Sequence, residues 1–314
     1  MLVALGLLVA GHGASAQTGQ LTINKHTMPN RPGGPPAGPP AAPPGRGLGF
    51  PSIFGLNGIR YHGGPIMLGT TNAYAILYGG WDSSPTPALI TQFLGDDGGS
   101  SYFNINTTYT AGSRRVTNAV RFAGSTQVGY TKGTTLSDAK VQEIVAAAIA
   151  SGALPPPGTA AGTAAASLPD PNGVYFVLIS KDVGESSGFL TTYCGWHTNG
   201  TIAGVDTKYS FVGDASKNLA ACAGQTAASP NNNPAGDAMV NVVAHELEEA
   251  VTDPDLNAWY DWRGMENADK CAWKFGTTTT LPSGAKYNVT MNGHKYLIQQ
   301  NWLNANGGLC TLSY

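Results

Sequence analysis

The sequence His-Glu-Leu-Glu-Glu at residues 245–249 lies in an apolar, helix-forming segment at 238–251. It differs by one residue from the His-Glu-x-x-His motif of zinc peptidases, because Glu249 stands where a second histidine is expected. Side chains four residues apart lie about 40° from each other around a helix axis. His245 and Glu249 can therefore contact one metal ion, and Glu246 can act as the general base that accepts a proton from water.

The helix around this motif is predicted to be buried. Its apolar side chains cover a wide arc, which is typical of a helix that packs against a core. Asp237 is the expected N-cap, and Pro254 ends the helix because a residue before proline disfavours helical geometry. Buried His and Glu side chains then need partners or a metal ion. The apolar positions are Met239, Val242, Val243, Leu247, Ala250 and Val251.

Acidic residues are concentrated within and after the motif. Residues 244–269 contain eight of the nineteen acids and a single base, Arg263. Like charges at this density repel unless solvent or a cation screens them. Some zincins take a third ligand from a carboxylate about twenty residues downstream, and Glu266 is the predicted ligand here. Asp269 is either an alternative ligand or the acid that orients His245. A solvated acidic helix followed by a charged loop is the other interpretation.

The predicted ligands, one imidazole and two carboxylates, favour a divalent cation. Zn is the predicted metal, and the oxygen-rich set leaves Mn or Ca as alternatives. Two carboxylates neutralise the ion, so bound water is acidified less than in a histidine-rich site. Low activity or a purely structural metal is therefore the alternative to catalysis. His62 and His197, in glycine-rich segments, are weaker candidates for a ligand or a substrate contact.

The beginning of the chain has the composition of an exported protein. Residues 1–16 are predicted to be a signal peptide, because an apolar run at 2–10 precedes the small residues at 14–16. Residues 17–48, rich in Pro and Gly, are predicted to be a disordered linker, and 49–314 the folded domain. A net charge of −2 with only 11% charged residues argues against nucleic acid as a partner. No later apolar run approaches the roughly 18 residues of a membrane span. We therefore predict a secreted protein.

Four cysteines without C-x-x-C spacing argue against a thiolate zinc site. In a secreted chain they predict two disulfides with three alternative pairings. We favour Cys194–Cys222 and Cys271–Cys310, since each closes a loop of moderate length. Three Asn-x-Ser/Thr sequons would carry glycans in a eukaryotic source. These are Asn106, Asn199 and Asn288.

The pattern of strands and helices predicts an α+β domain with a mixed sheet and an active-site helix of the zincin type. Strands and helices interleave without a strict strand–helix–strand period. The nearly continuous apolar run at 173–180 predicts a central strand that is buried on both faces. Asn292-Gly293 predicts the turn of a hairpin. The other expected elements are strands at 72–78 and 209–212 and helices at 86–95 and 136–151.

Three segments resemble the EXORDIUM / phosphate-induced protein 1 family. They are Tyr61-His-Gly-Gly-Pro65 with the following strand to Trp81, then Cys194-Gly-Trp-His197, and Asn292-Gly-His-Lys-Tyr-Leu297. The resemblance covers roughly residues 55–314. It implies a secreted, apoplastic or cell-wall protein that is linked to growth responses and has no firmly established activity. Plant members generally lack His-Glu-x-x-Glu, whereas bacterial and fungal relatives resemble residues 245–254 of this chain.

Two functions are consistent with these features. The main prediction is a secreted metal-dependent hydrolase, a peptidase that acts on an extracellular peptide or protein substrate. The alternative is a non-catalytic extracellular or cell-wall protein of the EXORDIUM type. In that case the protein acts in growth signalling or binds cell-wall glycan, with a structural metal or none.

Overall fold

The computed structural model describes residues 23–32 and 58–314. The predicted signal peptide and most of the predicted linker lie outside the described residues. Six strands form one mixed sheet, in which the four neighbours from β11 to β6 are parallel and the pairs β1–β10 and β10–β11 are antiparallel. Across the sheet the strands are β1 (His26–Pro29), β10 (Tyr193–Ile202), β11 (Val205–Gly213), β8 (Gly173–Ile179), β3 (Thr71–Tyr78) and β6 (Val120–Val128).

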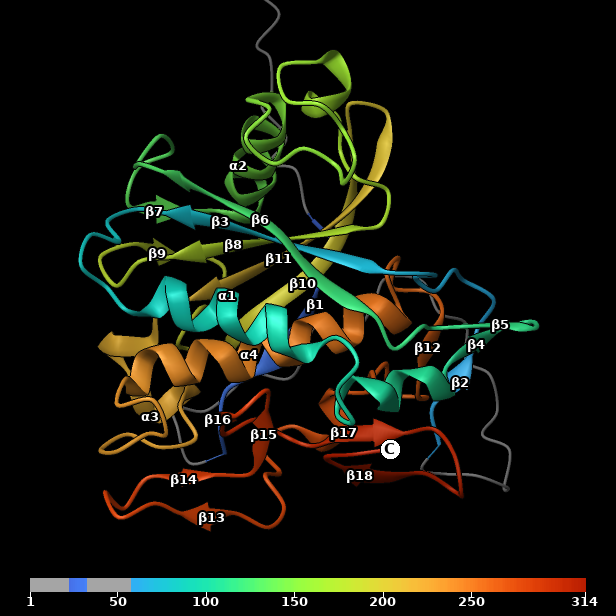
Figure 1. Cartoon of the computed structure of the whole chain (residues 1–314), viewed down its shortest axis with the longest axis vertical. Coiled ribbons are helices and arrows are strands. Elements are labelled where there is room, and N and C mark those ends of the chain that lie inside the picture. Colours follow the sequence, from blue (N-terminus) through green and yellow to red (C-terminus); the bar gives the residue numbers. More distant parts are fainter. Residues whose placement is uncertain (1–22, 33–57) are drawn as a thin grey trace, which may run out of the picture.

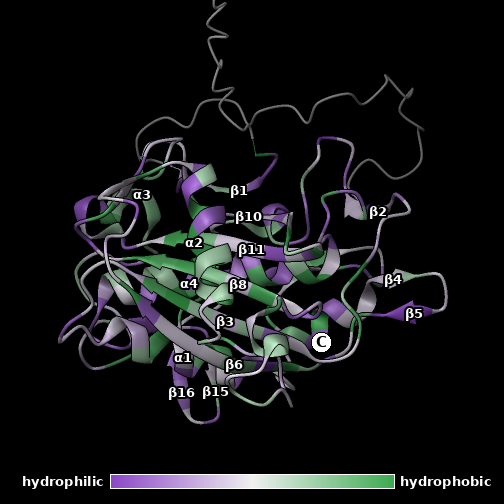
Figure 2. Cartoon of the chain, turned by 90° about the horizontal axis from the view of Figure 1, so that it is seen from above, coloured by the Kyte–Doolittle hydropathy of each residue, from purple (hydrophilic) through white to green (hydrophobic). Residues whose placement is uncertain are grey.

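Helices cover both faces of this sheet, as Figure 1 shows. Helix α2 (Asp138–Ala150) packs on one face, and α1 (Thr86–Asp97) and α4 (Pro234–Thr252) pack side by side on the other. Every residue of β8 is buried, because a strand between two helical layers has no solvent face. Figure 2 shows the hydrophobic residues gathered in the central strands β8 and β3. The predicted mixed sheet is thus present. The prediction that the domain has a zincin-type fold remains a prediction.

Shorter elements surround the sheet and its helices. The hairpins formed by strands β13 to β18 lie beyond α4, on the side away from the sheet (Figure 1). The short strand pairs are β2 (Arg60–Tyr61) with β12 (Trp259–Tyr260), β4 (Thr110–Ala111) with β5 (Arg114–Arg115), β7 (Thr135–Leu136) with β9 (Gly184–Glu185), β13 (Thr279–Thr280) with β14 (Lys286–Tyr287), β15 (Val289–Met291) with β16 (His294–Tyr296), and β17 (Asn301–Leu303) with β18 (Leu309–Thr311). The short helices are α3 (Leu219–Cys222) and the 3-10 helices η1 (Phe103–Thr108), η2 (Ala164–Ser167), η3 (Ala215–Lys217) and η4 (Asp269–Cys271).

The expected strands and helices are confirmed, with one difference at the start of α4. This helix begins at Pro234, and its N-cap is Asn233, whose side chain accepts a hydrogen bond from the Gly236 amide. The predicted cap, Asp237, lies in the first turn and accepts hydrogen bonds from Asn231 instead. Proline is favoured at the first helical position because its missing N–H needs no partner there. The helix therefore starts one turn earlier than its apolar pattern suggests.

The predicted linker is wrong for residues 23–32, which form an ordered edge of the sheet. Strand β1 pairs with β10, and Met28 is completely buried. The carbonyl of Pro29 accepts a hydrogen bond from the Trp273 indole at 2.9 Å, and the Arg31 amide donates to the Ala221 carbonyl at 2.7 Å. Pro29 is tolerated because β1 is an edge strand. The short strand β1 could not be predicted from composition, because Pro and Gly dominate the composition of the whole segment around it.

Both favoured disulfides are confirmed. Cys194–Cys222 ties β10 to α3, and Cys271–Cys310 ties η4 to β18. The three sequons differ in their surroundings. Asn106 is completely buried, so the predicted glycan at this position does not fit the folded chain. Asn199 and Asn288 are partly exposed, and both side-chain amides donate hydrogen bonds within the chain.

Candidate metal centre

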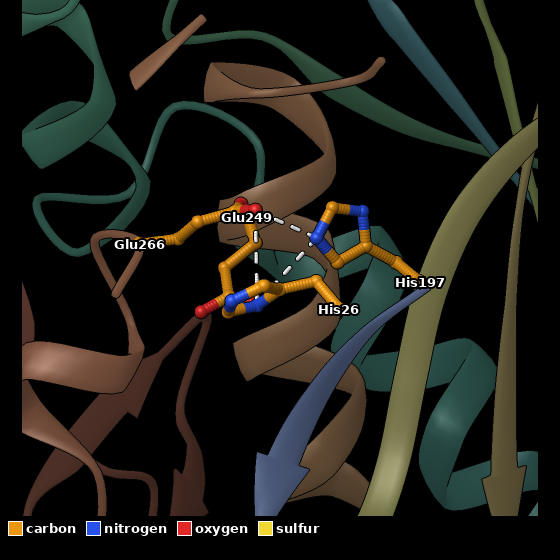
Figure 3. Close-up of side chains that lie close together, drawn as sticks. All are labelled: His26, His197, Glu249 and Glu266. Carbon is orange, nitrogen blue, oxygen red and sulfur yellow. Dashed lines mark hydrogen bonds and ion pairs between the residues drawn. The ribbon is translucent and has the colours of Figure 1, made fainter. Parts of the chain in front are cut away.

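Two histidines lie on paired strands and point the same way. His26 of β1 is directly opposite His197 of β10, and cross-strand partners project from the same face of a sheet. Their ring centroids are 5.9 Å apart. Figure 3 shows both imidazoles directed toward Glu249 of α4 and Glu266 of the loop before η4. Four separate segments of the chain thus bring ligand side chains together.

Gly195 of β10 allows α4 to come close to the sheet. A Cβ at this position would lie 2.5 Å from Val242 Cγ1 and 2.8 Å from the Phe211 carbonyl oxygen. It would also lie 3.1 Å from a carboxylate oxygen of Glu246, which places this carboxylate over the strand. Gly195 and His197 are two residues apart and therefore share one face of β10. The missing side chain thus sets the distance between α4 and the His197 imidazole.

Glu249 is the central carboxylate, because its two oxygens face different imidazoles. Oε2 lies 3.2 Å from His26 Nδ1 and 3.5 Å from His197 Nε2. Oε1 lies 3.1 Å from His245 Nε2, one helical turn earlier, and accepts a hydrogen bond from the Asp269 amide at 3.1 Å. The i,i+4 relation predicted for His245 and Glu249 is therefore present.

Glu266 and Asp269 approach the same imidazoles from the loop and from η4. Glu266 Oε2 is 3.3 Å from His197 Nε2, and its Oε1 is 3.7 Å from His26 Nδ1. Asp269 Oδ2 is 3.2 Å from His26 Nε2, and its Oδ1 is 3.5 Å from His245 Nε2. The structure thus brings His245, Glu249, Glu266 and Asp269 into one cluster.

The ring of His26 is oriented by a backbone carbonyl. Its Nε2 lies 3.0 Å from the Gly264 oxygen, and a carbonyl can only accept a hydrogen bond. Nε2 therefore carries the proton in the neutral ring, which leaves the Nδ1 lone pair facing Glu249 and Glu266. An outer hydrogen bond of this kind is what fixes the ring of a metal-binding histidine.

The cluster is almost closed to solvent. The His26 side chain is 22% exposed, whereas those of His197, Glu249 and Glu266 are at most 2% exposed. Burial raises the pKa of Glu266 to about 8, although His26 and His197 oppose this. Burial acts against ionisation of Glu249 too, but His245 and His26 hold the pKa of this carboxyl well below its usual range. Without a metal, the imidazoles act as counterions of the carboxylates.

Several buried polar atoms of the cluster make no hydrogen bond. These atoms are both ring nitrogens of His197 and of His245, both carboxylate oxygens of Glu246, Oε2 of Glu266 and Oδ1 of Asp269. Buried polar atoms in folded proteins nearly always have a partner, because an unpaired one costs about 1–3 kcal/mol. A cation bound among them would satisfy several of these atoms together.

The spacing of the ligand atoms suits a small divalent ion. In a tetrahedral zinc site with bonds of about 2.0–2.2 Å, neighbouring ligand atoms are roughly 3.3–3.6 Å apart. The imidazole nitrogens of His26 and His197 lie 3.2 to 3.7 Å from the nearest carboxylate oxygens of Glu249 and Glu266. The ligand atoms of these four residues all lie within 4.8 Å of one another. The residues therefore fit a four-ligand site.

Sequence reasoning missed His26 and gave His197 too little weight. His26 carries no local signal, because it stands in a segment whose composition predicts a linker. His197 lies inside β10 and not in a loop, and its position two residues after Gly195 was the available signal. His62, the other weaker candidate, stacks on Tyr260 with ring centroids 3.6 Å apart. Among the described residues, His62 belongs to neither group of neighbouring metal-ligating side chains.

Sequence comparison places this chain in a known family. The conserved region of phosphate-induced protein 1 matches residues 59–312. The chain therefore belongs to the phosphate-induced protein 1 family, as its resemblance predicted. The matched region contains His197, Glu249 and Glu266 and starts after His26.

Two relatives from Arabidopsis thaliana are named as EXORDIUM-like proteins. Protein EXORDIUM-like 3 is 28% identical over 285 residues, which cover 78% of this chain and 80% of the relative. Protein EXORDIUM-like 5 is 29% identical over 286 residues, which cover 78% and 75%. No solved structure matches the chain. None of the helices in the described ranges is long and apolar enough to cross a membrane. These matches support the EXORDIUM-type hypothesis and not the peptidase hypothesis.

Proposed function

We propose that this chain is a secreted, non-catalytic protein of the EXORDIUM type whose fold is closed by a structural divalent metal. His26, His197, Glu249 and Glu266 hold the ion. The observation that carries the proposal is the convergence of these four side chains, from four separate segments, on one buried point. A metal there fastens β1 to β10, α4 and the loop before η4. Binding energy at a site that exists only in the folded chain adds directly to its stability.

Zn is the metal that this ligand set favours most. Two imidazoles and two carboxylates supply borderline nitrogen donors together with enough negative charge to neutralise a 2+ ion. The ligand set that was predicted from the sequence contained one imidazole. The proposed set contains two, those of His26 and His197, and is therefore richer in nitrogen ligands. Mn stays an alternative, whereas Ca fits less well because it prefers six or more oxygen ligands.

The ligand set supports a structural role. Structural zinc sites are closed by four protein ligands, while catalytic sites keep one position for water or substrate. Here the four ligands are already supplied by side chains, and three of them are at most 2% exposed. Two disulfides and the predicted signal peptide support secretion. A peptide, protein or cell-wall glycan partner stays a prediction.

Metal analysis of a His197→Ala variant tests the proposal. We expect the wild-type chain, dialysed against Zn²⁺, to retain metal and to lose thermal stability when a chelator is added. Free metal at 1,000 times its dissociation constant stabilises a fold by about 4 kcal/mol. The variant should hold at least one ion fewer and respond less to the chelator. His62→Ala is the matched control, because His62 is an exposed histidine outside the cluster. A wild-type chain that binds no metal and melts at the same temperature with chelator would overturn the proposal.

Hydrolysis is a second candidate function, and Glu246 is the observation that favours it. Its carboxylate is buried, has no hydrogen-bond partner, and lies with His245 and Glu249 in one group of neighbouring side chains. In the hydrolase hypothesis, Glu246 is the general base that takes a proton from the water molecule that attacks a peptide carbonyl. On this hypothesis, Glu246→Gln abolishes peptide cleavage and leaves the metal content unchanged. Equal cleavage by the two proteins, or none by the wild type, removes the hydrolase hypothesis.

A further inference from the structure

We infer that the centre holds two divalent cations, with Glu249 as the bridge between them. The inference rests on the proposed metal site and adds a second one to it. Two groups of metal-ligating side chains share a single residue. The first group is His26, His197, Glu249 and Glu266, and the second is His245, Glu246 and Glu249.

The two oxygens of Glu249 are directed to different groups. Oε2 faces His26 and His197, and Oε1 faces His245. A carboxylate with one oxygen toward each of two ligand sets is the arrangement that bridges paired metal ions roughly 3.5–4 Å apart. A single ion would use one of these sets and leave the other without a cation. The geometry of Glu249 therefore provides for both positions.

Unpartnered polar atoms mark the second position independently of the first. His245 and Glu246 are completely buried, and none of their side-chain nitrogen or oxygen atoms makes a hydrogen bond. Asp269 Oδ1 is also buried without a partner, and lies 3.5 Å from His245 Nε2. Asp269 thus places a further oxygen atom beside the His245 imidazole. This assignment gives Glu246 the role of a ligand and not of a general base.

The charge of the centre also fits two ions. The carboxylates of Glu246, Glu249, Glu266 and Asp269 carry four negative charges when ionised. Three of them, Glu249, Glu266 and Asp269, form ion pairs with His26, His197 and His245. Imidazoles that bind a metal are neutral, so two divalent cations balance the four carboxylates, while one leaves two buried negative charges. The nearby carboxylate of Asp253 accepts hydrogen bonds from the Asn257 and Ala258 amides, which offset its charge.

Native mass spectrometry of the intact chain after dialysis against Zn²⁺ tests the inference by counting ions. We expect two ions in the wild type and one in Glu246→Gln, whose side chain keeps its shape and loses its charge. Loading with Mn²⁺ should give the electron paramagnetic resonance spectrum of a coupled pair, a readout that needs no variant. His245→Ala, a second way to empty the second position, should also hold one ion.

Each alternative result has a distinct meaning. One ion in the wild type, with the spectrum of isolated Mn²⁺, overturns the second site and leaves the proposed structural metal in place. No ion in the wild type overturns both proposals. Two ions in Glu246→Gln overturn the ligand role of Glu246, and together with lost peptide cleavage they would favour the hydrolase hypothesis.

Discussion

Glu249→Gln is expected to remove all bound metal from the centre. Glu249 faces His26 and His197 with one oxygen and His245 with the other, and it is the residue that the two groups of metal-ligating side chains have in common. A glutamine keeps the shape but offers one neutral oxygen and an NH₂ group that cannot bind a cation. Elemental analysis after dialysis against Zn²⁺ should fall from the wild-type content to none. Thermal melting should then be insensitive to chelator.

Glu248→Gln is the matched control for this experiment. Glu248 is the neighbouring residue on α4 and is equally buried, but its Oε2 accepts a hydrogen bond from the Asn301 amide at 2.5 Å. Burial holds the pKa of this carboxyl well above its usual range, so a neutral glutamine resembles its native form. The control should keep its metal. A Glu249→Gln protein with the wild-type metal content, or equal losses in both variants, would contradict the central position of Glu249.

Removing the Cys194–Cys222 disulfide is expected to lower the free energy of unfolding by about 3–4 kcal/mol. The bond closes a loop with a sequence separation of 28, and this value follows from the entropy that such a loop withdraws from the unfolded chain. Both cysteines are buried, so alanine at each position leaves no unpaired polar group. Urea unfolding of the double variant Cys194→Ala/Cys222→Ala gives the measurement. A change below about 1 kcal/mol would exclude this role for the disulfide.

The same disulfide is expected to hold β1 in place. Arg31 follows β1, and its amide donates to the carbonyl of Ala221, the neighbour of Cys222. Hydrogen exchange at the Arg31 amide should therefore become faster in the double variant. Cys271→Ala/Cys310→Ala is the comparison, since that bond has a sequence separation of 39 and should contribute similar stability from a different part of the chain. Equal exchange at Arg31 in both variants would argue against the link between Cys222 and β1.

Local sequence patterns predicted the helix of the centre and the ligands on or shortly after it. The apolar arc of α4 and its proline boundary determine where the helix lies, and the four-residue spacing places His245 beside Glu249. Glu266 and Asp269 follow within a short loop, so their distance from α4 is limited by the chain itself. Short spacing is the physical reason that these four residues could be found without a structure.

His26 and His197 are different, because their positions depend on strand pairing between distant segments. No period in the sequence indicates that β1 pairs with β10, or that His26 lies opposite His197. The pairing is decided by burial of Met28, by hydrogen bonds to residues 192–223, and by the disulfide that holds this region together. The two imidazoles therefore meet only in the folded chain.

By itself, the sequence determined the central strands, the buried helix, its His245–Glu249 pair and the family, because these features rest on periodicity, spacing and local motifs. Only the tertiary structure decided that the centre contains three imidazoles and not one. It also decided that Glu249 faces two ligand sets, since its Oε2 lies beside His26 and His197, which arrive from other elements, while its Oε1 lies beside His245 of the same helix. Contacts between distant segments are a property of packing, and packing has no signature in a short stretch of residues.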